Sequence, residues 1–279
     1  MPTPTVDLAF KAQFESESHA YFQRRGSKLS NSVRTRKGVA GKSTTFQTYG
    51  VAEAVQKTRH GDVPQSHPNH APVECLLQDW YVQIPIDKLD LTKLDNDERE
   101  QAIIAGSAAM GQKVDDIIIT NALSQTTRFV GNYATGLTHP ILRQGIEKYW
   151  ETDVPEDGES YGVLSNHAWQ EFKAISQVSS ADYVGELYPW LKGRKAFNYE
   201  DIIWMPHTGL PLANTDDRDN YLYHKSAVGV AWGDEITTDW FWDGRAQCWL
   251  VTMKMSVGAV LIDERGVVEL RLDDDTAIS

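Results

Sequence analysis

The chain has 279 residues and a net charge of −12, with 41% hydrophobic and 24% charged residues, which is ordinary for a soluble protein with a buried core. No apolar run approaches the roughly 18 residues of a membrane span, and the opening MPTPT is unlike a signal peptide, so no membrane partner is expected. Two cysteines, Cys75 and Cys248, are too few for a disulfide framework and fit a reducing cytoplasm.

Charge is distributed unevenly along the chain. Residues 1–42 hold eight of the 27 basic residues but only three of the 39 acidic ones. A basic arm on an acidic body is expected to meet a polyanion or the body of another subunit, although a solvated basic terminus explains the charge alone equally well. The arm residues expected at a subunit interface are Arg24, Arg25, Lys28, Arg34, Arg36 and Lys37.

The first third of the chain predicts extended structure. A loose apolar stripe predicts a short helix over residues 6–25, but no helical stripe survives between Ser27 and Ile84, where glycines and prolines interrupt the sequence. A compact domain rarely keeps so long a region without a packed apolar face. The region is therefore either disordered or ordered by burial against other copies of the chain. Its retained aromatic residues favour the second alternative and a self-assembling protein.

Two strand-like limbs are predicted in this region, at residues 43–58 and 73–87. The Pro- and His-rich residues 59–72 join them, so the whole segment is expected to form a long hairpin-like loop. The loop residues expected to contact a neighbouring subunit are Phe46, Tyr49, His60, Asp62 and Trp80.

A long helix follows, from about Asn96 to Leu123. Acidic residues crowd its start, where they suit the free N–H groups and the positive end of the helix dipole. At 1.5 Å per residue it would be roughly 42 Å long, a spine for one unit of the protein. The apolar pattern does not keep heptads for long enough to favour a coiled coil. The residues expected in its core are Ile103, Met110, Val114, Ile117 and Ile118.

After Gly131 the pattern becomes that of a packed α/β domain. Helices are predicted at residues 140–150 and 166–175. Strands are predicted at residues 161–164, 201–205, 227–232, 237–242, 248–255, 258–262 and 267–272. The acidic stretch at residues 214–220 is expected to be a polar surface loop.

Motifs for enzyme chemistry are weak. Residues 38–44, GVAGKST, lack the first glycine of a phosphate-binding loop, because Arg36 stands in its place. His60, Asp62, His67, His70 and Cys75 are possible metal ligands, but no paired-cysteine or helical spacing organises them. Residues 214–220 lack the glycine and final glutamate of a calcium loop. No GxSxG elbow occurs. We therefore expect no cofactor, no metal and no enzyme activity.

Taken in order, these features resemble the major capsid proteins of tailed double-stranded-DNA bacteriophages, whose fold is also found in the herpesvirus capsid floor. GSKL (26–29), GKSTTF (41–46) and RHGDVP (59–64) look like that family's arm and loop. HKSAVGVA (224–231), GAVLID (258–263) and GVVE (266–269) look like its late strands. The resemblance spans roughly residues 20–272.

The resemblance implies an α+β fold in four parts. Residues 1–36 would be an N-terminal arm and 37–90 an extended loop. Residues 91–128 and 245–279 would form a peripheral domain with the spine helix, and 129–244 an α/β axial domain.

The resemblance also implies self-assembly through pentamers and hexamers into an icosahedral capsid that encloses double-stranded DNA, bound non-specifically on the inner face. Assembly would take place in the host bacterial cytoplasm. Portal and decoration proteins are implied partners, with a separate scaffolding protein or none. Some relatives cross-link neighbours through a Lys–Asn isopeptide bond, but the resemblance assigns no such residues here.

Two other interpretations remain at this point. An encapsulin-like shell of the same fold would enclose enzyme cargo instead of DNA. A metal- or nucleotide-dependent enzyme would use residues 38–75.

Overall fold

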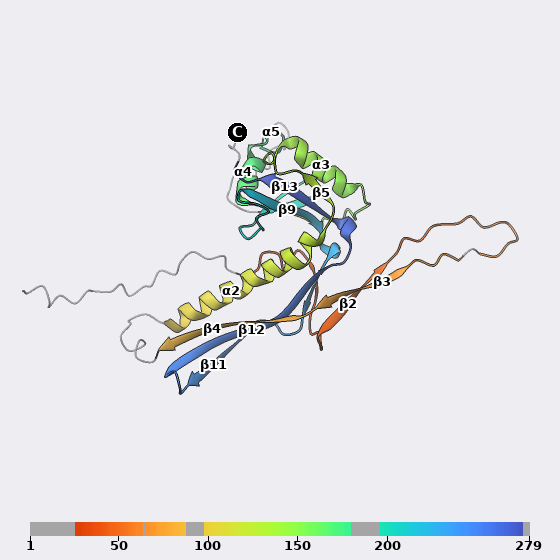
Figure 1. The fold of residues 1–279 in the computed structure, drawn as a ribbon. Coiled ribbons are helices and arrows are strands. Elements are labelled where there is room, and N and C mark those ends of the chain that lie inside the picture. The colour runs from red at the N-terminus through yellow and green to blue at the C-terminus, as the bar shows by residue number, and fades with distance from the viewer. Residues whose placement is uncertain (1–25, 64, 88–97, 180–195, 276–279) are drawn as a thin grey trace, which may run out of the picture.

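A computed structural model describes residues 26–63, 65–87, 98–179 and 196–275, and Figure 1 shows them as two sheet-containing units with a long hairpin projecting from one side. The helix expected at residues 6–25 and the basic residues Arg24 and Arg25 lie outside the described part of the chain. No helix among the described residues is long and apolar enough to cross a membrane.

A five-stranded sheet runs along the spine helix. Its strands are β1 (Arg34–Arg36), β10 (Val228–Trp232), β12 (Cys248–Leu261), β11 (Thr237–Asp243) and β4 (Gln78–Asp87). β12 pairs with β10 and then β11 on one side and with β4 on the other, always antiparallel, whereas β1 is parallel to β10. The strands expected separately at residues 248–255 and 258–262 are therefore one continuous strand.

A six-stranded sheet forms the second unit. Its order is β5 (Phe129–Gly131), β13 (Val267–Asp273), β9 (Asp217–His224), β6 (Ser160–Leu164), β8 (Ile202–Pro206) and β7 (Phe197–Tyr199). Helices α3 (His139–Trp150) and α4 (Asn166–Ala174) cover one face, and α5 (Ser176–Ser179) follows α4. Short 3-10 turns are η2 (Leu123–Gln125), η3 (Lys225–Ala227) and η4 (Glu264–Gly266). The aromatic side chains of Trp169, Phe172 and Trp204 lie at the centre of this core.

The spine helix α2 (Glu98–Asn121) has 24 residues and is therefore about 36 Å long. Its contact row follows four-residue spacing through Ala102, Gly106, Met110, Val114 and Ile118, all of which are buried. Because four residues advance about 40° more than one full turn, this row drifts around the helix and follows the twist of the sheet.

This drift corrects the expectation for Ile103, whose side chain is 38% exposed. Ile103 lies off the contact row at the first turns, where small Ala102 and Gly106 face the sheet instead. A Cβ on Gly106 would lie 2.8 Å from the Met253 sulfur, so the helix and β12 approach closely at this point. Met110, Val114, Ile117 and Ile118 belong to a buried cluster that also includes Tyr221 and Tyr223 of the second sheet.

The hairpin is shorter than expected. β2 (Ser43–Tyr49) pairs with β3 (His70–Leu76), but the residues after Leu77 leave the hairpin and pair with β12 as β4. The expected limb at residues 73–87 is thus two strands in different sheets. The reason is that Trp80, Val82, Ile84 and Ile86 alternate toward the core beneath α2, a pattern that needs a covered sheet.

The expected domain boundary at residue 244 is also wrong at the level of the sheets. It falls within the turn between β11 and β12, which pair as a hairpin. β10 and β11 belong to the sheet beneath α2, whereas β13 joins the six-stranded sheet beside β9. β9 itself begins at Asp217, inside the stretch expected to be a surface loop, and becomes fully buried from Asn220 onward.

We expect Ile117→Asp to prevent folding of the subunit. The Ile117 side chain is buried among apolar residues, and an unpaired carboxylate there should cost several kcal/mol. The soluble yield and the far-UV circular dichroism of the variant check this. Ile103→Asp on the exposed side of the same helix is the matched control and should fold, so a folded Ile117→Asp subunit would contradict the packing described here.

Candidate assembly surfaces

A buried carboxylate fastens the arm to the body of the protein. Asp115 lies on α2, and its side chain is inaccessible to solvent. Its Oδ1 accepts hydrogen bonds from the Ser27 hydroxyl (2.5 Å) and from the backbone N–H groups of Lys28 and Leu29 (3.1 Å each). Its Oδ2 lies 3.0 Å from Nε2 of His207, just beyond β8. Asp115 therefore joins the arm, the spine helix and the six-stranded sheet at one point.

The donors around Asp115 decide its charge state. The backbone N–H of Gly209 donates to Nδ1 of His207, so the proton of this ring lies on Nε2 and points at the carboxylate. Burial alone would raise the pKa of Asp115, but the hydrogen bonds from His207, Ser27 and the backbone of Leu29 and Lys28 together lower it. The carboxylate is therefore held ionised inside the protein.

Packing completes this attachment, which we call the arm clasp (residues 27–33). Leu29 is fully buried, Val33 nearly so, and the Ser32 hydroxyl hydrogen-bonds the hydroxyl of Tyr223 on β9. Gly111 of α2 lies directly beneath the chain at Gly26, since a Cβ there would be 2.5 Å from a backbone carbon. The arm thus follows a fixed path over the helix.

The basic residues of the arm are exposed but already contact their own subunit. Lys28 Nζ donates to the carbonyl of Pro206 (3.2 Å), and Arg36 donates to the carbonyl of Thr45 (3.1 Å). Arg34 lies 5.8 Å from the ring centre of Phe46, and Lys37 pairs with Glu235 at 2.7 Å. These contacts fix the direction of the side chains while leaving their charges at the surface.

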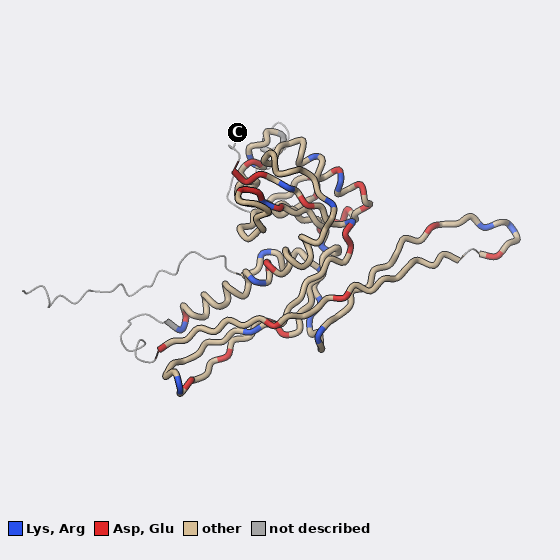
Figure 2. Tube along the Cα trace, viewed as in Figure 1, with Lys and Arg blue, Asp and Glu red and all other residues tan. Residues whose placement is uncertain are grey.

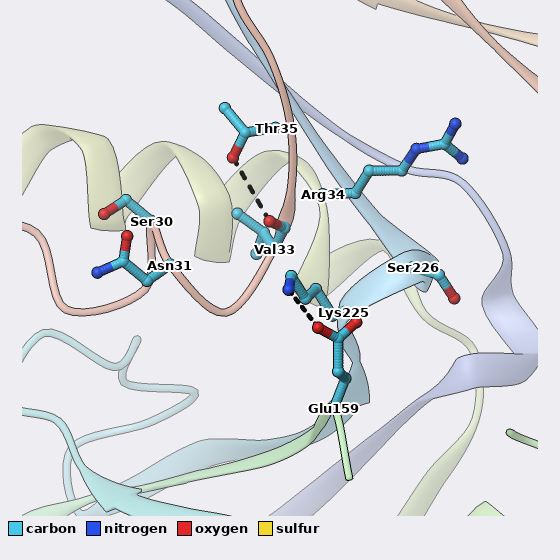
Figure 3. Close-up of a pocket in the computed structure, with 8 residues that line it drawn as sticks. All are labelled: Ser30, Asn31, Val33, Arg34, Thr35, Glu159, Lys225 and Ser226. Carbon is cyan, nitrogen blue, oxygen red and sulfur yellow. Dashed lines mark hydrogen bonds and ion pairs between the residues drawn. The ribbon is translucent and has the colours of Figure 1, made fainter. Parts of the chain in front are cut away.

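A groove of about 470 Å³ runs between the arm and the six-stranded sheet (Figure 3). Lys225 and Glu159 pair across its floor at 2.5 Å, and the Thr35 hydroxyl donates to the carbonyl of Val33 at 3.4 Å. Its lining consists of Ser30, Asn31, Val33, Arg34, Thr35, Glu159, Lys225 and Ser226.

The loop residues expected at an interface separate into two groups. Phe46 is only 4% exposed and packs within its own subunit against Cys75 and Gly229, so its expected place at a subunit interface is corrected. Trp80 lies on β4, half-buried beneath α2, with the Lys113 ammonium 4.1 Å from its ring centre. Both aromatic residues are used inside the subunit because they face a covered sheet.

The outer part of the hairpin is different. Tyr49 is 68% exposed and stacks edge-on against His70 at 4.4 Å, and His60 and Asp62 lie exposed near the tip. Beyond Tyr49, residues 50–63 and 65–69 form no strand with any described residue, and Val51 is 75% exposed. Figure 1 shows this part reaching away from the rest of the protein.

The sequence and fold were compared with known proteins. The family model of the phage capsid proteins matches residues 6–274. The chain belongs to the phage capsid protein family. The capsid of the cyanophage P-SCSP1u has the same fold, with a TM-score of 0.77, 16% identity, and coverage of 99% of this chain and 96% of that one.

Two further solved structures agree with this assignment. A structure from Mycobacterium phage Che8 has a TM-score of 0.72 at 14% identity, covering 94% of this chain and 97% of that one. The head of Helicobacter pylori bacteriophage KHP40 has a TM-score of 0.72 at 11% identity, covering 95% of each chain. The sequence matches none of the curated proteins with which it was compared.

The resemblance to phage capsid proteins is thereby confirmed, and the role of the chain is structural: multiple copies assemble into a capsid of the virion. The enzyme alternative is not favoured. Burial raises the pKa of the Cys75 thiol to about 11, which disfavours the thiolate that a metal needs. Among the described residues, no group of three His, Cys, Asp or Glu side chains is placed to hold a metal ion.

One further constellation has a structural use in this capsid protein. Nδ1 of His224 lies 2.7 Å from the Ser226 hydroxyl, and Nε2 of the same ring lies 2.9 Å from Asp157, so the three residue types of a hydrolase triad meet here. However, Nδ1 also accepts the backbone N–H of Ser226, so His224 caps the turn η3. The hydrogen bond from His224 lowers the pKa of the exposed Asp157 carboxyl and anchors that loop.

We expect Asp115→Asn to destabilise the subunit by roughly 2–5 kcal/mol. Four donors converge on Asp115, and an amide replaces one accepting oxygen by an NH2 group that faces donors. Urea unfolding of the unassembled subunit at pH 7 measures the effect. Glu100→Gln, at an exposed position of the same helix, is the control and should change little.

The effect of Asp115 should depend on pH. Its folded-state pKa is lowered, so its contribution is present above the unfolded value of about 4 and disappears as pH falls through the folded value. The difference in the free energy of unfolding between the parent chain and Asp115→Asn should therefore become smaller below about pH 4. A difference that grows in acid would show that the carboxylate is not the stabilising form.

Proposed function

We propose that this capsid protein forms pentamers and hexamers that close into an icosahedral shell around double-stranded DNA. Within the shell, the hairpin of each subunit lies on a neighbouring subunit. The observation that carries this proposal is the row of exposed apolar side chains along a segment with little packing of its own, namely Tyr49, Val51, Val55 and Val63. Exposed apolar residues grouped on a projecting element are typical of an interaction surface.

The arm supports the same proposal through charge. Arg34, Arg36 and Lys37 are exposed on one short segment, whereas the chain as a whole carries a net charge of −12. Copies of an acidic body repel one another unless basic segments lie between them. We assign these residues to contacts with acidic surfaces of adjacent subunits and, on the inner face, with packaged DNA. Assembly takes place in the host bacterial cytoplasm, where portal, decoration and scaffolding proteins are candidate partners.

The four parts of the subunit are proposed with limits adjusted to the sheets. Residues 1–36 are the arm, and the extended loop ends at Leu77, one residue before β4 begins. The peripheral part consists of α2 with β4, β10, β11 and β12, and the axial part is the six-stranded sheet with α3 and α4.

Deletion of residues 59–72 tests the hairpin. Of the deleted residues, His70, Ala71 and Pro72 belong to β3, and the other described ones pack against neither core of the subunit. We therefore expect a soluble, folded protein that no longer closes into shells. Negative-stain electron microscopy and sedimentation of the purified protein measure closure. Particles of normal size and number from the shortened chain would disprove the role of the hairpin.

Charge reversal of Arg34, Arg36 and Lys37 together tests the arm. Each contact is exposed and contributes roughly 0–1 kcal/mol, so the melting temperature of the subunit should change little. Shell yield should fall, because every subunit repeats the lost contact, and assembly of the parent should weaken as salt rises. Light scattering during assembly at several salt concentrations follows both effects. The control keeps the charges by changing both arginines to lysine, and equal assembly of the reversed variant at every salt concentration would leave the arm as a solvated terminus.

A further inference from the structure

The outer edge of β4 is an open row of backbone hydrogen-bonding groups. Among the described residues, β4 pairs with β12 alone, and β4 and β11 lie on opposite sides of β12 (Figure 1). A strand edge without a partner offers its outward N–H and C=O groups to another extended chain.

The hydrogen bonds of β12 show which groups of β4 point outward. Ser256 donates its N–H to Asp234 and accepts from Gly233, both on the far side of β12 from β4. Because the backbone groups of one residue point to one side, Asp79, which lies opposite Ser256, has its N–H and C=O directed away from β12.

The same orientation recurs at every second residue, which places Tyr81, Gln83 and Pro85 in the outward row. Pro85 is an independent check, since proline has no N–H and fits a ladder only with its nitrogen turned away from the partner strand. The proline also ends the row of donors. The usable edge therefore runs from Asp79 to Gln83.

Apart from Pro85 and the two terminal aspartates, this edge lacks the usual protection of an isolated strand. β4 contains no lysine or arginine, and no charged residue stands between Asp79 and Asp87. By contrast, the short edge strand β1 carries Arg34 and Arg36. An unprotected polar edge in a soluble protein is a place where another chain is expected to bind.

The hairpin supplies a segment with matching properties. Residues 51–57, VAEAVQK, are exposed, contain neither proline nor glycine and form no strand with any described residue. The returning side of the loop before β3 contains Pro64 and Pro68 and suits a strand poorly. At 3.3 Å per residue, residues 51–57 and residues 78–84 are each about 23 Å long. Lys57 provides a charge opposite to that of Asp79.

We propose that the open edge of β4 receives residues 51–57 of a second copy of the chain as an added strand. The backbone hydrogen bonds hold the segment, and Tyr81, which is 66% exposed, covers the valine side chains of the incoming strand. The donor must be another copy, because the hairpin points away from β4 of its own chain (Figure 1). This inference rests on the proposed function and identifies the surface on which the hairpin lies.

Proline substitution tests the edge directly. Tyr81→Pro removes only an outward N–H, so the subunit should fold and shell yield should fall at least tenfold. Tyr81→Ala removes the same side chain but keeps the N–H, and should assemble better than Tyr81→Pro. Val82→Pro removes an inward N–H and should unfold the subunit. Normal assembly of Tyr81→Pro, or an unfolded Tyr81→Pro subunit, would overturn the proposal.

Cysteine pairs identify the segment that binds. With Lys57 opposite Asp79 in an antiparallel pair, Glu53 lies opposite Gln83. Glu53→Cys with Gln83→Cys should therefore give disulfide-linked multimers on a non-reducing gel after shells form, and none from unassembled subunits. The matched control is Glu53→Cys with Thr238→Cys on the edge of β11, and native Cys75 and Cys248 are buried and remain in both variants. Shells whose cross-links form only at Thr238, or at neither position, would overturn the proposal. A parent chain that forms no shells would instead overturn the proposed function itself.

Discussion

The buried carboxylate of Asp115 is the constraint on which the arrangement of this subunit depends. It joins three parts of the chain that are distant in sequence, because Ser27 and His207 lie 88 and 92 positions from it. Ionised and inaccessible to solvent, the group is stable only while its donors remain in place, so the arm clasp and the turn after β8 are fixed together. A subunit held in this way presents its arm from a defined position on the spine helix.

Rigidity at the clasp contrasts with the open hydrogen-bonding groups elsewhere. One apolar core beneath α2 extends to Tyr221 and Tyr223 of the six-stranded sheet, and a second lies beneath α3 and α4. The edge of β4 and the outer hairpin nevertheless leave backbone groups without a strand partner among the described residues. Such groups are tolerated in water but become a source of specific pairing when copies meet. The subunit therefore folds around its own buried cores but leaves backbone hydrogen-bonding groups that a neighbouring copy can pair with. This suits a protein that assembles into a shell.

The parts predictable from sequence were those with local signals. Acidic residues at the start of α2 and its apolar period predicted the helix closely, and alternating residues predicted most late strands. A fixed apolar stripe wrongly predicts a buried Ile103, because it ignores the drift of the contact row over a twisted sheet. The pattern does not predict β9, because the first residues of this strand are charged. The Asp115–His207 contact has no local pattern, although a carboxylate between Val114 and Ile117 in an apolar stripe was a usable signal.

The distribution of exposed apolar residues reconciles solubility with assembly. Val51, Val55 and Val63 lie on the projecting hairpin loop, away from the body of the subunit, and Pro85 limits the open edge of β4 to a short window. A single encounter between two copies therefore involves a short strand and a few exposed charges, each worth little by itself. In a closed shell every subunit repeats the same contacts, and their sum becomes large because loss of one contact no longer frees the subunit. Weak, repeated pairing of this kind allows a misplaced subunit to dissociate before closure and holds it firmly afterwards.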